Sequence, residues 1–144
     1  MKNPNFIAGG FHEDRRGRVS FINEFDATAV RRCYWIQHPT TDTVRAWQGH
    51  RLETKWFVCT RGGFEVRLIE PDNWETPSKQ LPVTVFSLTE KQPGVLWVPP
   101  GFVTGFRATK NHSTLMVYSD VALEASVSDD YRFDPKTWIP WTNI

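Results

Sequence analysis

The sequence of 144 residues has only two cysteines, no excess of one charge and no long hydrophobic run. Cys33 and Cys59 lack the close spacing of a redox or zinc motif and stand in apolar, strand-like runs, so we expect reduced core residues. The net charge of +1 gives no reason to expect nucleic acid or a membrane surface as a partner. No segment approaches the ~20 apolar residues of a membrane-spanning helix.

The amino-terminal residues also lack the apolar core of a secretion signal, so we expect a cytoplasmic protein. A length of 144 residues suits one domain, 1–144, whose hydrophobic core needs no disulfide or metal for stability.

Short β-prone runs separated by turn residues are the main regularity of the chain. We predict nine strands, over residues 18–25, 30–37, 43–48, 55–60, 64–70, 82–88, 95–98, 103–108 and 113–120. Phe64, Val66 and Leu68 alternate with charged residues, and Leu115 and Val117 repeat this period of two, so each set predicts a buried strand face. We also expect a hairpin turn at 61–63, a rigid turn at 99–101, a surface loop over 70–82 and a short helix near 128–138. Together these features predict an all-β jelly roll.

Several stretches, in this order, resemble two related groups of cupin enzymes, the dTDP-4-keto-6-deoxyhexose 3,5-epimerases and the dTDP-sugar 3,4-ketoisomerases. The stretches are Asp14-Arg15-Arg16-Gly17, residues 31–36 (Arg-Arg-Cys-Tyr-Trp-Ile), residues 45–50 (Arg-Ala-Trp-Gln-Gly-His), residues 96–106 around Pro-Pro-Gly-Phe, and the tail 131–141. The resemblance implies a cupin jelly roll (a double-stranded β-helix), a dTDP-linked keto-sugar as ligand, no cofactor and a homodimer.

The sequence departs from the epimerase pattern at the residues that carry the chemistry. Gln48 and Thr104 stand where the epimerases have histidines, and the chain ends too soon after Trp141 for their downstream carboxylate, which orients the base, to have a counterpart. His50, however, corresponds to the second histidine of the ketoisomerase pair, and Tyr34 to the first of its tyrosines. The resemblance therefore implies a 3,4-ketoisomerase rather than a 3,5-epimerase.

Isomerising a 4-keto sugar means removing a proton next to a carbonyl, which needs a base that titrates near neutral pH and a donor for the enolate oxygen. Histidine is the usual base. We expect His12 and His112 to be solvated and His38, at a strand end, to be structural. His50 is the candidate base, or else a satisfied polar residue in the barrel mouth. In a regular strand Gln48 and His50 would point to the same side and form one polar cluster.

Other side chains have two interpretations each. Tyr34 would donate a hydrogen bond to the enolate or relay a proton, or else be a core tyrosine with a satisfied hydroxyl. Tyr118 is a further candidate for the acid. Trp47 or Trp97 would stack on thymine, or fill the core as most large rings do.

The diphosphate of a nucleotide sugar needs cationic partners. By resemblance, Arg16 and Arg45 would bind the nucleotide and Lys55 would lie within the site. In a regular strand Arg45 and His50 would face opposite sides, so both serve one site only if the chain bends, for which Gly49 is suited.

A metal is not expected. Of the ligand set of metal-binding cupins, only His50 and Glu53 remain, and two protein ligands rarely hold a transition metal. Two other functions stay open. The lost histidine positions favour a non-catalytic module that binds a sugar nucleotide, and an unrelated small-molecule cupin enzyme remains because fold alone does not determine function.

Overall fold

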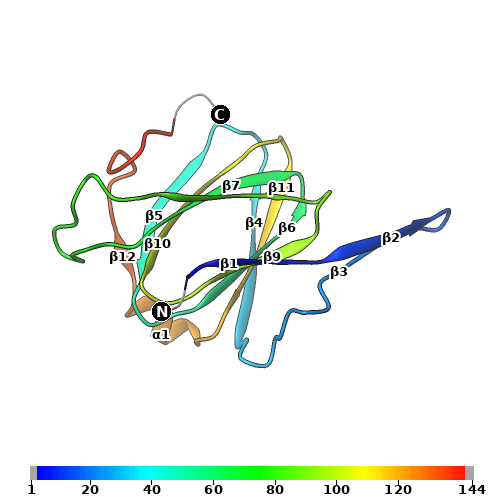
Figure 1. The fold of residues 1–144 in the computed structure, drawn as a ribbon, viewed down its shortest axis with the longest axis horizontal. Coiled ribbons are helices and arrows are strands. Elements are labelled where there is room, and N and C mark those ends of the chain that lie inside the picture. Colours follow the sequence, from blue (N-terminus) through cyan, green and yellow to red (C-terminus); the bar gives the residue numbers. More distant parts are fainter. Residues whose placement is uncertain (1–2, 142–144) are drawn as a thin grey trace.

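The computed structural model describes residues 3–141, which form two five-stranded antiparallel sheets, a separate hairpin and one short helix (Figure 1). The first sheet contains, in spatial order, β1 (Asn5–Ala8), β9 (Gly94–Val98), β6 (Lys55–Arg61), β11 (Ser113–Ser119) and β4 (Arg32–His38). The second contains β12 (Tyr131–Arg132), β5 (Val44–His50), β10 (Phe102–Ala108), β7 (Gly63–Ile69) and β8 (Thr84–Thr89). The predicted all-β jelly roll is confirmed.

The hairpin of β2 (Gly10–Asp14) and β3 (Gly17–Phe21) extends away from the two sheets (Figure 1). All nine predicted strands are present, as β3 to β11, with ends shifted by a few residues. Three strands were not predicted, β1, β2 and β12, because they are short and carry little buried surface. The predicted short helix is present as α1, but it spans Leu123–Val127, just before the predicted residues 128–138, which contain β12 instead.

Two tight turns carry the chain from one sheet to the other. The predicted turn at 61–63 exists, but it does not close a hairpin, because β6 pairs with β9 and β11 whereas β7 pairs with β8 and β10. Gly62 has a φ of 72° there, and Gly101, in the turn between β9 and β10, has a φ of 96°. Positive φ is easily reached only by glycine, so these two residues allow the sharp crossings that stack the sheets.

The main hydrophobic core lies between the two sheets. Phe64, Val66 and Leu68 of β7 are buried there, together with Leu115 and Val117 of β11. The period-two prediction for both strands is therefore confirmed. The packed inner faces hold the sheets together and position the strands that carry the candidate site.

A second, smaller core covers the opposite face of the second sheet. Trp47, Ile69, Val103 and Trp138 are buried in it, and Trp74 of the 70–82 loop packs against it. The rings of Trp47 and Trp138 meet edge to face with their centroids 5.3 Å apart. The carboxy-terminal segment and the loop thus cover this face of the sheet.

The two cysteines differ in environment. Both are free thiols, as predicted, and Cys59 is buried, but Cys33 is exposed, so the prediction of a core residue is wrong for Cys33. The reason is its place in β4, where Tyr34 and Ile36 pack against the core and Cys33 belongs to the outward-facing set. Within residues 3–141, no helix has the length and apolar character needed to cross a lipid bilayer.

Candidate active site

A cavity of about 470 Å³ lies between the two sheets. Four residues singled out from the sequence, Tyr34, Arg45, Gln48 and Lys55, all line it. The remaining lining residues are Ile36, Val44, Ala46, Phe57, Thr104, Phe106 and Arg132. The fold therefore brings together side chains from β4, β5, β6, β10 and β12 that are far apart in the sequence.

An extra residue in β5 places Arg45 and Gln48 on the same cavity. Gln48 pairs with Thr104 of β10, but Arg45 pairs with Phe106, so three steps along β5 match two along β10. Such a bulge reverses the alternation of side chains on one strand. The bend was expected at Gly49; instead the irregularity lies between Arg45 and Gln48.

The cavity wall is strongly cationic. Arg45, Lys55 and Arg132 line it, and its described lining includes no carboxylate. The Lys55 side chain is buried, and its ammonium group donates a hydrogen bond to the Tyr34 hydroxyl over 3.1 Å. Burying a cation without a carboxylate partner is costly, and a bound anion would offset that cost.

Gln48 and Arg132 share a carboxylate at the edge of the cavity. The amide nitrogen of Gln48 donates to Oδ1 of Asp130 over 3.1 Å, and Nε of Arg132 donates to the same oxygen over 2.8 Å. These contacts, with that of Arg132 first, lower the pKa of Asp130, which keeps the group an anion near neutral pH.

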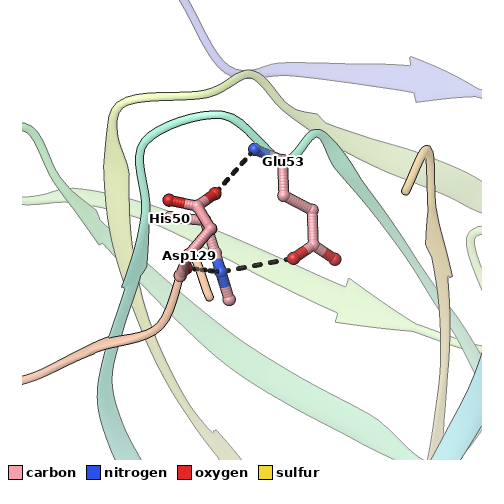
Figure 2. A group of neighbouring side chains, drawn as sticks. All are labelled: His50, Glu53 and Asp129. Carbon is pink, nitrogen blue, oxygen red and sulfur yellow. Dashed lines mark hydrogen bonds and ion pairs between the residues drawn. The ribbon is translucent and has the colours of Figure 1, made fainter. Parts of the chain in front are cut away.

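His50 lies behind this wall rather than in it, because it is buried and is absent from the cavity lining. Figure 2 shows its ring beside Asp129 and Glu53. Nδ1 lies 2.6 Å from the backbone carbonyl oxygen of Asp129 and 3.2 Å from Oε1 of Glu53. Both neighbours are acceptors, so Nδ1 carries the proton and the lone pair is on Nε2. Nε2 is buried and has no partner among residues 3–141.

Burial, followed by the positive charge of Lys55, lowers the pKa of His50 from its ordinary value of 6.5, although Glu53 and Asp129 act in the opposite direction. The imidazole is therefore neutral at pH 7. A neutral imidazole with one free nitrogen is the form that can accept a proton.

The carboxylate of Glu53 is itself held by three further donors. Oε2 accepts from Arg32 Nη2 over 3.1 Å and from the Ser119 hydroxyl over 2.5 Å, and Oε1 accepts from the Ser126 hydroxyl over 2.8 Å. The Glu53 side chain has no exposed surface. It is a fixed anion that holds the orientation of the His50 ring.

Asp129 holds the loop that carries His50 and Glu53. Its carboxylate accepts hydrogen bonds from three successive backbone N–H groups, those of Arg51, Leu52 and Glu53, over 2.8, 2.8 and 3.0 Å. Figure 2 shows the bond from Glu53. The downstream carboxylate of the epimerases was expected to have no counterpart, but a carboxylate from a different place in the chain, that of Glu53, lies beside the candidate base. Glu53 lies beside Nδ1, and the segment after α1 supplies the carbonyl of Asp129.

His50, Glu53 and Asp129 are close enough to be considered as metal ligands. Their oxygen atoms, however, already accept hydrogen bonds from the backbone, two serines and Arg32. Nδ1 of His50 also carries a proton. This donor set fits an orienting network rather than a cation site, and the absence of a metal stays a prediction.

Other residues considered from the sequence lie away from the cavity. Arg16 is on the hairpin, 82% exposed, and pairs with Asp14 over 2.7 Å. Trp47 is buried in the second core, and Trp97 is not in the cavity lining, so neither lies where it would stack on a base in this cavity. Tyr118 packs against Phe25, with ring centroids 5.5 Å apart, and does not line the cavity either.

Arg132 and Asp129 are the residues that sequence reasoning missed. Arg132 stands in the tail whose resemblance to the epimerases had been noted, but nothing local indicated that this tail adds a strand beside Gln48. The pairing of His50 with Glu53, three residues later, was considered only as a metal site. The same spacing also fits a histidine and the carboxylate that orients it.

No model of a known protein family matches this sequence, and no curated protein sequence does either. Solved structures do share its fold. A dTDP sugar isomerase from Desulfovibrio desulfuricans is 16% identical with a TM-score of 0.80, over 99% of this chain and 93% of that one. A sugar 3,4-ketoisomerase from Thermoanaerobacterium thermosaccharolyticum in complex with TDP is 20% identical with a TM-score of 0.70, over 92% and 90%.

A dTDP-4-dehydrorhamnose 3,5-epimerase from Bacillus anthracis, with TDP and PPi bound, is 16% identical with a TM-score of 0.77, over 99% of this chain and 86% of that one. Both enzyme groups that the sequence motifs resemble are therefore among these structural neighbours. The chain has the cupin-type jelly-roll fold of the dTDP-sugar isomerases and epimerases.

Proposed function

We propose that this protein binds a dTDP-linked 4-keto-6-deoxyhexose and isomerises it without a metal or other cofactor, as a 3,4-ketoisomerase. The observation that carries the proposal is the cavity between the sheets. Among residues 3–141 its lining has three cations and no carboxylate, and of the three only Arg132 is paired with an acid, Asp130, which lies outside the lining. A ligand with a diphosphate and an enolisable ketone matches both the charge of Arg45, Lys55 and Arg132 and the neutral histidine behind them.

In the proposed reaction, Nε2 of His50 takes the proton from C3 of the sugar, next to the C4 carbonyl. The electrons of the C–H bond form the C3–C4 double bond of an enediol, and the C4 oxygen takes the proton of the Tyr34 hydroxyl, whose phenolate Lys55 stabilises. His50 then returns its proton to C4, and the Tyr34 phenolate takes the proton of the C3 hydroxyl, which gives the 3-keto sugar. Gln48 assists as a neutral hydrogen-bonding side chain of the cavity lining, and no atom is gained or lost.

A specific observation favours a second candidate, a module that binds the sugar nucleotide without turning it over. His50 is only 4% exposed and does not line the cavity, and Gln48 and Thr104 occupy the places of two catalytic histidines of the epimerases. The isomerase therefore requires a small opening of the wall toward Nε2 when substrate binds. The binding module requires none.

Incubation with dTDP-4-keto-6-deoxyglucose in D2O separates these readings. A 3,4-ketoisomerase forms the 3-keto product with deuterium at C4 and places deuterium at C3 of the recovered substrate. Deuterium at C3 and C5 with the ketone still at C4 indicates a 3,5-epimerase, and dTDP binding without exchange indicates the binding module. Absence of dTDP binding contradicts the whole proposal.

His50→Asn tests the base. The expected result is loss of exchange with dTDP affinity retained, because the side chain does not line the binding cavity. Glu124→Gln, an exposed change in α1, is the matched control. Exchange at the unmodified rate in His50→Asn would mean that another group moves the proton.

We also propose that the protein is a homodimer. Within one chain, Arg16 lies on the projecting hairpin and is remote from the cavity lining, so a role for Arg16 in nucleotide binding requires the cavity of a second copy. Light scattering after size exclusion gives the mass of the assembly. Arg16→Ala should weaken dTDP binding only if the protein is a dimer in solution.

A further inference from the structure

His38 makes a contact that its expected structural role does not explain. Nε of Arg45 donates a hydrogen bond to Nε2 of His38 over 3.0 Å. An arginine can only donate, so Nε2 of His38 must hold a lone pair and the ring proton must be on Nδ1. Nδ1 has no partner among residues 3–141, and the residue is 2% exposed.

The position of the ring is determined by packing. His38 is the last residue of β4 and pairs with Ser113 of β11. Its ring lies against Phe64 with centroids 5.5 Å apart and against Phe106 with centroids 6.0 Å apart. Phe106 also lines the cavity. The imidazole is thus a rigid acceptor at the margin of the cationic cavity.

Arg45 depends on this acceptor. It has no ion pair with a carboxylate in the described part of the chain, and the contact with His38 uses only Nε. Both terminal nitrogens remain for a ligand. When a ligand binds a long, free side chain on the cavity wall, that side chain loses rotamer freedom, which lowers the affinity. A side chain that is already held in place before binding loses less.

We propose that His38 is a positioning residue that, in its neutral form, holds the guanidinium of Arg45 at the cavity for the anionic group of the ligand. The inference rests on the proposed function, because it presumes that the cavity takes a nucleoside diphosphate. It assigns His38 no contact with the ligand.

Protonation of His38 removes this contact, since the imidazolium has no lone pair and repels Arg45. Burial, then the charge of Arg45, lowers the pKa of His38 from 6.5. The ionisable residues that line a cleft of about 250 Å³ together with His38 are Arg61 and His112. Neither is an acid, so neither offers a negative charge that would oppose the release of Arg45.

The experiment measures dTDP affinity by calorimetry for the wild type, His38→Leu and His38→Gln. The amide oxygen of glutamine can take the place of Nε2 as acceptor, whereas leucine cannot. At pH 7.5 we expect His38→Leu to bind dTDP about three- to tenfold more weakly and His38→Gln to bind within twofold of the wild type. Equal affinity of His38→Leu and the wild type overturns the proposal.

The pH dependence and a double-mutant cycle test the same point. Between pH 7.5 and 5, the wild type should lose affinity more steeply than His38→Gln; the phosphate of dTDP titrates in this range too, but equally in both proteins. Adding His38→Leu to Arg45→Ala should cause no further loss, because the guanidinium is already absent. Additive losses, or parallel pH profiles, contradict the role of His38.

Nitrogen NMR of the ligand-free protein keeps this result separate from the proposed function. If the wild type binds no dTDP, the proposed function fails, yet the spectra still report whether Nε2 of His38 is the unprotonated, hydrogen-bonded nitrogen. A ring protonated at Nε2 at pH 7.5 overturns the contact itself. A correct tautomer that changes on Arg45→Ala supports it, and His38→Gln supplies a second folded variant if the leucine variant does not fold.

Discussion

Replacing Glu53 by glutamine is the most informative single change in this protein. The substitution keeps the shape of the side chain but removes its charge and one of its two acceptor oxygens. The native carboxylate, which has no exposed surface, accepts from Arg32, Ser119 and Ser126 and lies 3.2 Å from Nδ1 of His50. The new amide group adds two N–H donors to a buried position that four hydrogen-bond donors already surround.

The expected cost follows from these contacts. Removing one partner of a buried ion pair costs about 3–5 kcal/mol, but Arg32 is 21% exposed and partly solvated when left alone, which lowers that figure. The serine hydroxyls can turn to accept from the amide, whereas Nδ1–H of His50 cannot. We therefore expect a loss of about 2–4 kcal/mol in the free energy of unfolding, which for a chain of this size lowers Tm by about 6–12 °C.

Urea unfolding and calorimetry of the wild type and Glu53→Gln measure this loss directly. Glu75→Gln is the matched control, because Glu75 is exposed and its carboxylate has no partner among the described residues. The control should change the free energy of unfolding by less than about 0.5 kcal/mol. A change that small for Glu53→Gln would refute the view that this carboxylate anchors the His50 loop.

Three further results are expected. The free energy of unfolding should fall as the pH drops below about 6.5, by up to about 2.7 kcal/mol per pH unit, because the pKa values of His38 and His50 are lowered in the folded chain and the unfolded chain therefore takes up two protons first. Urea titrations at several pH values check this, and a flat profile between pH 6.5 and 5 contradicts it. A thiol reagent should modify Cys33 in the native protein and Cys59 only after unfolding, because burial is the main cause that raises the pKa of Cys59 to about 11; fast modification of two thiols in the native state would show that Cys59 is accessible. Lys55→Met should weaken dTDP binding about ten- to hundredfold in calorimetry, since the buried ammonium of the cavity wall is lost, and an unchanged affinity would place the diphosphate elsewhere.

The sequence alone was sufficient to predict the strands and the faces they bury. Alternation is a local property, so Phe64, Val66 and Leu68 point inward wherever β7 is placed, and the same holds for Leu115 and Val117. The motifs likewise identified Tyr34, Gln48, Arg45 and Lys55, which do line one cavity. The buried faces needed only the period of a strand, whereas the four cavity residues came from the resemblance of their motifs to the two enzyme groups.

Tertiary structure decided what no local pattern contains. The bulge in β5 that brings Arg45 and Gln48 to one cavity depends on the register with β10, and a register has no signal within a single strand. His50 is held by the backbone carbonyl of Asp129, which is 79 positions away in the chain. The Glu53 carboxylate is held in turn by hydrogen bonds from Arg32 and Ser119, which only the folded chain brings to it. Such contacts form because buried polar groups must find partners wherever the fold brings them, and that choice is made by the packed chain as a whole.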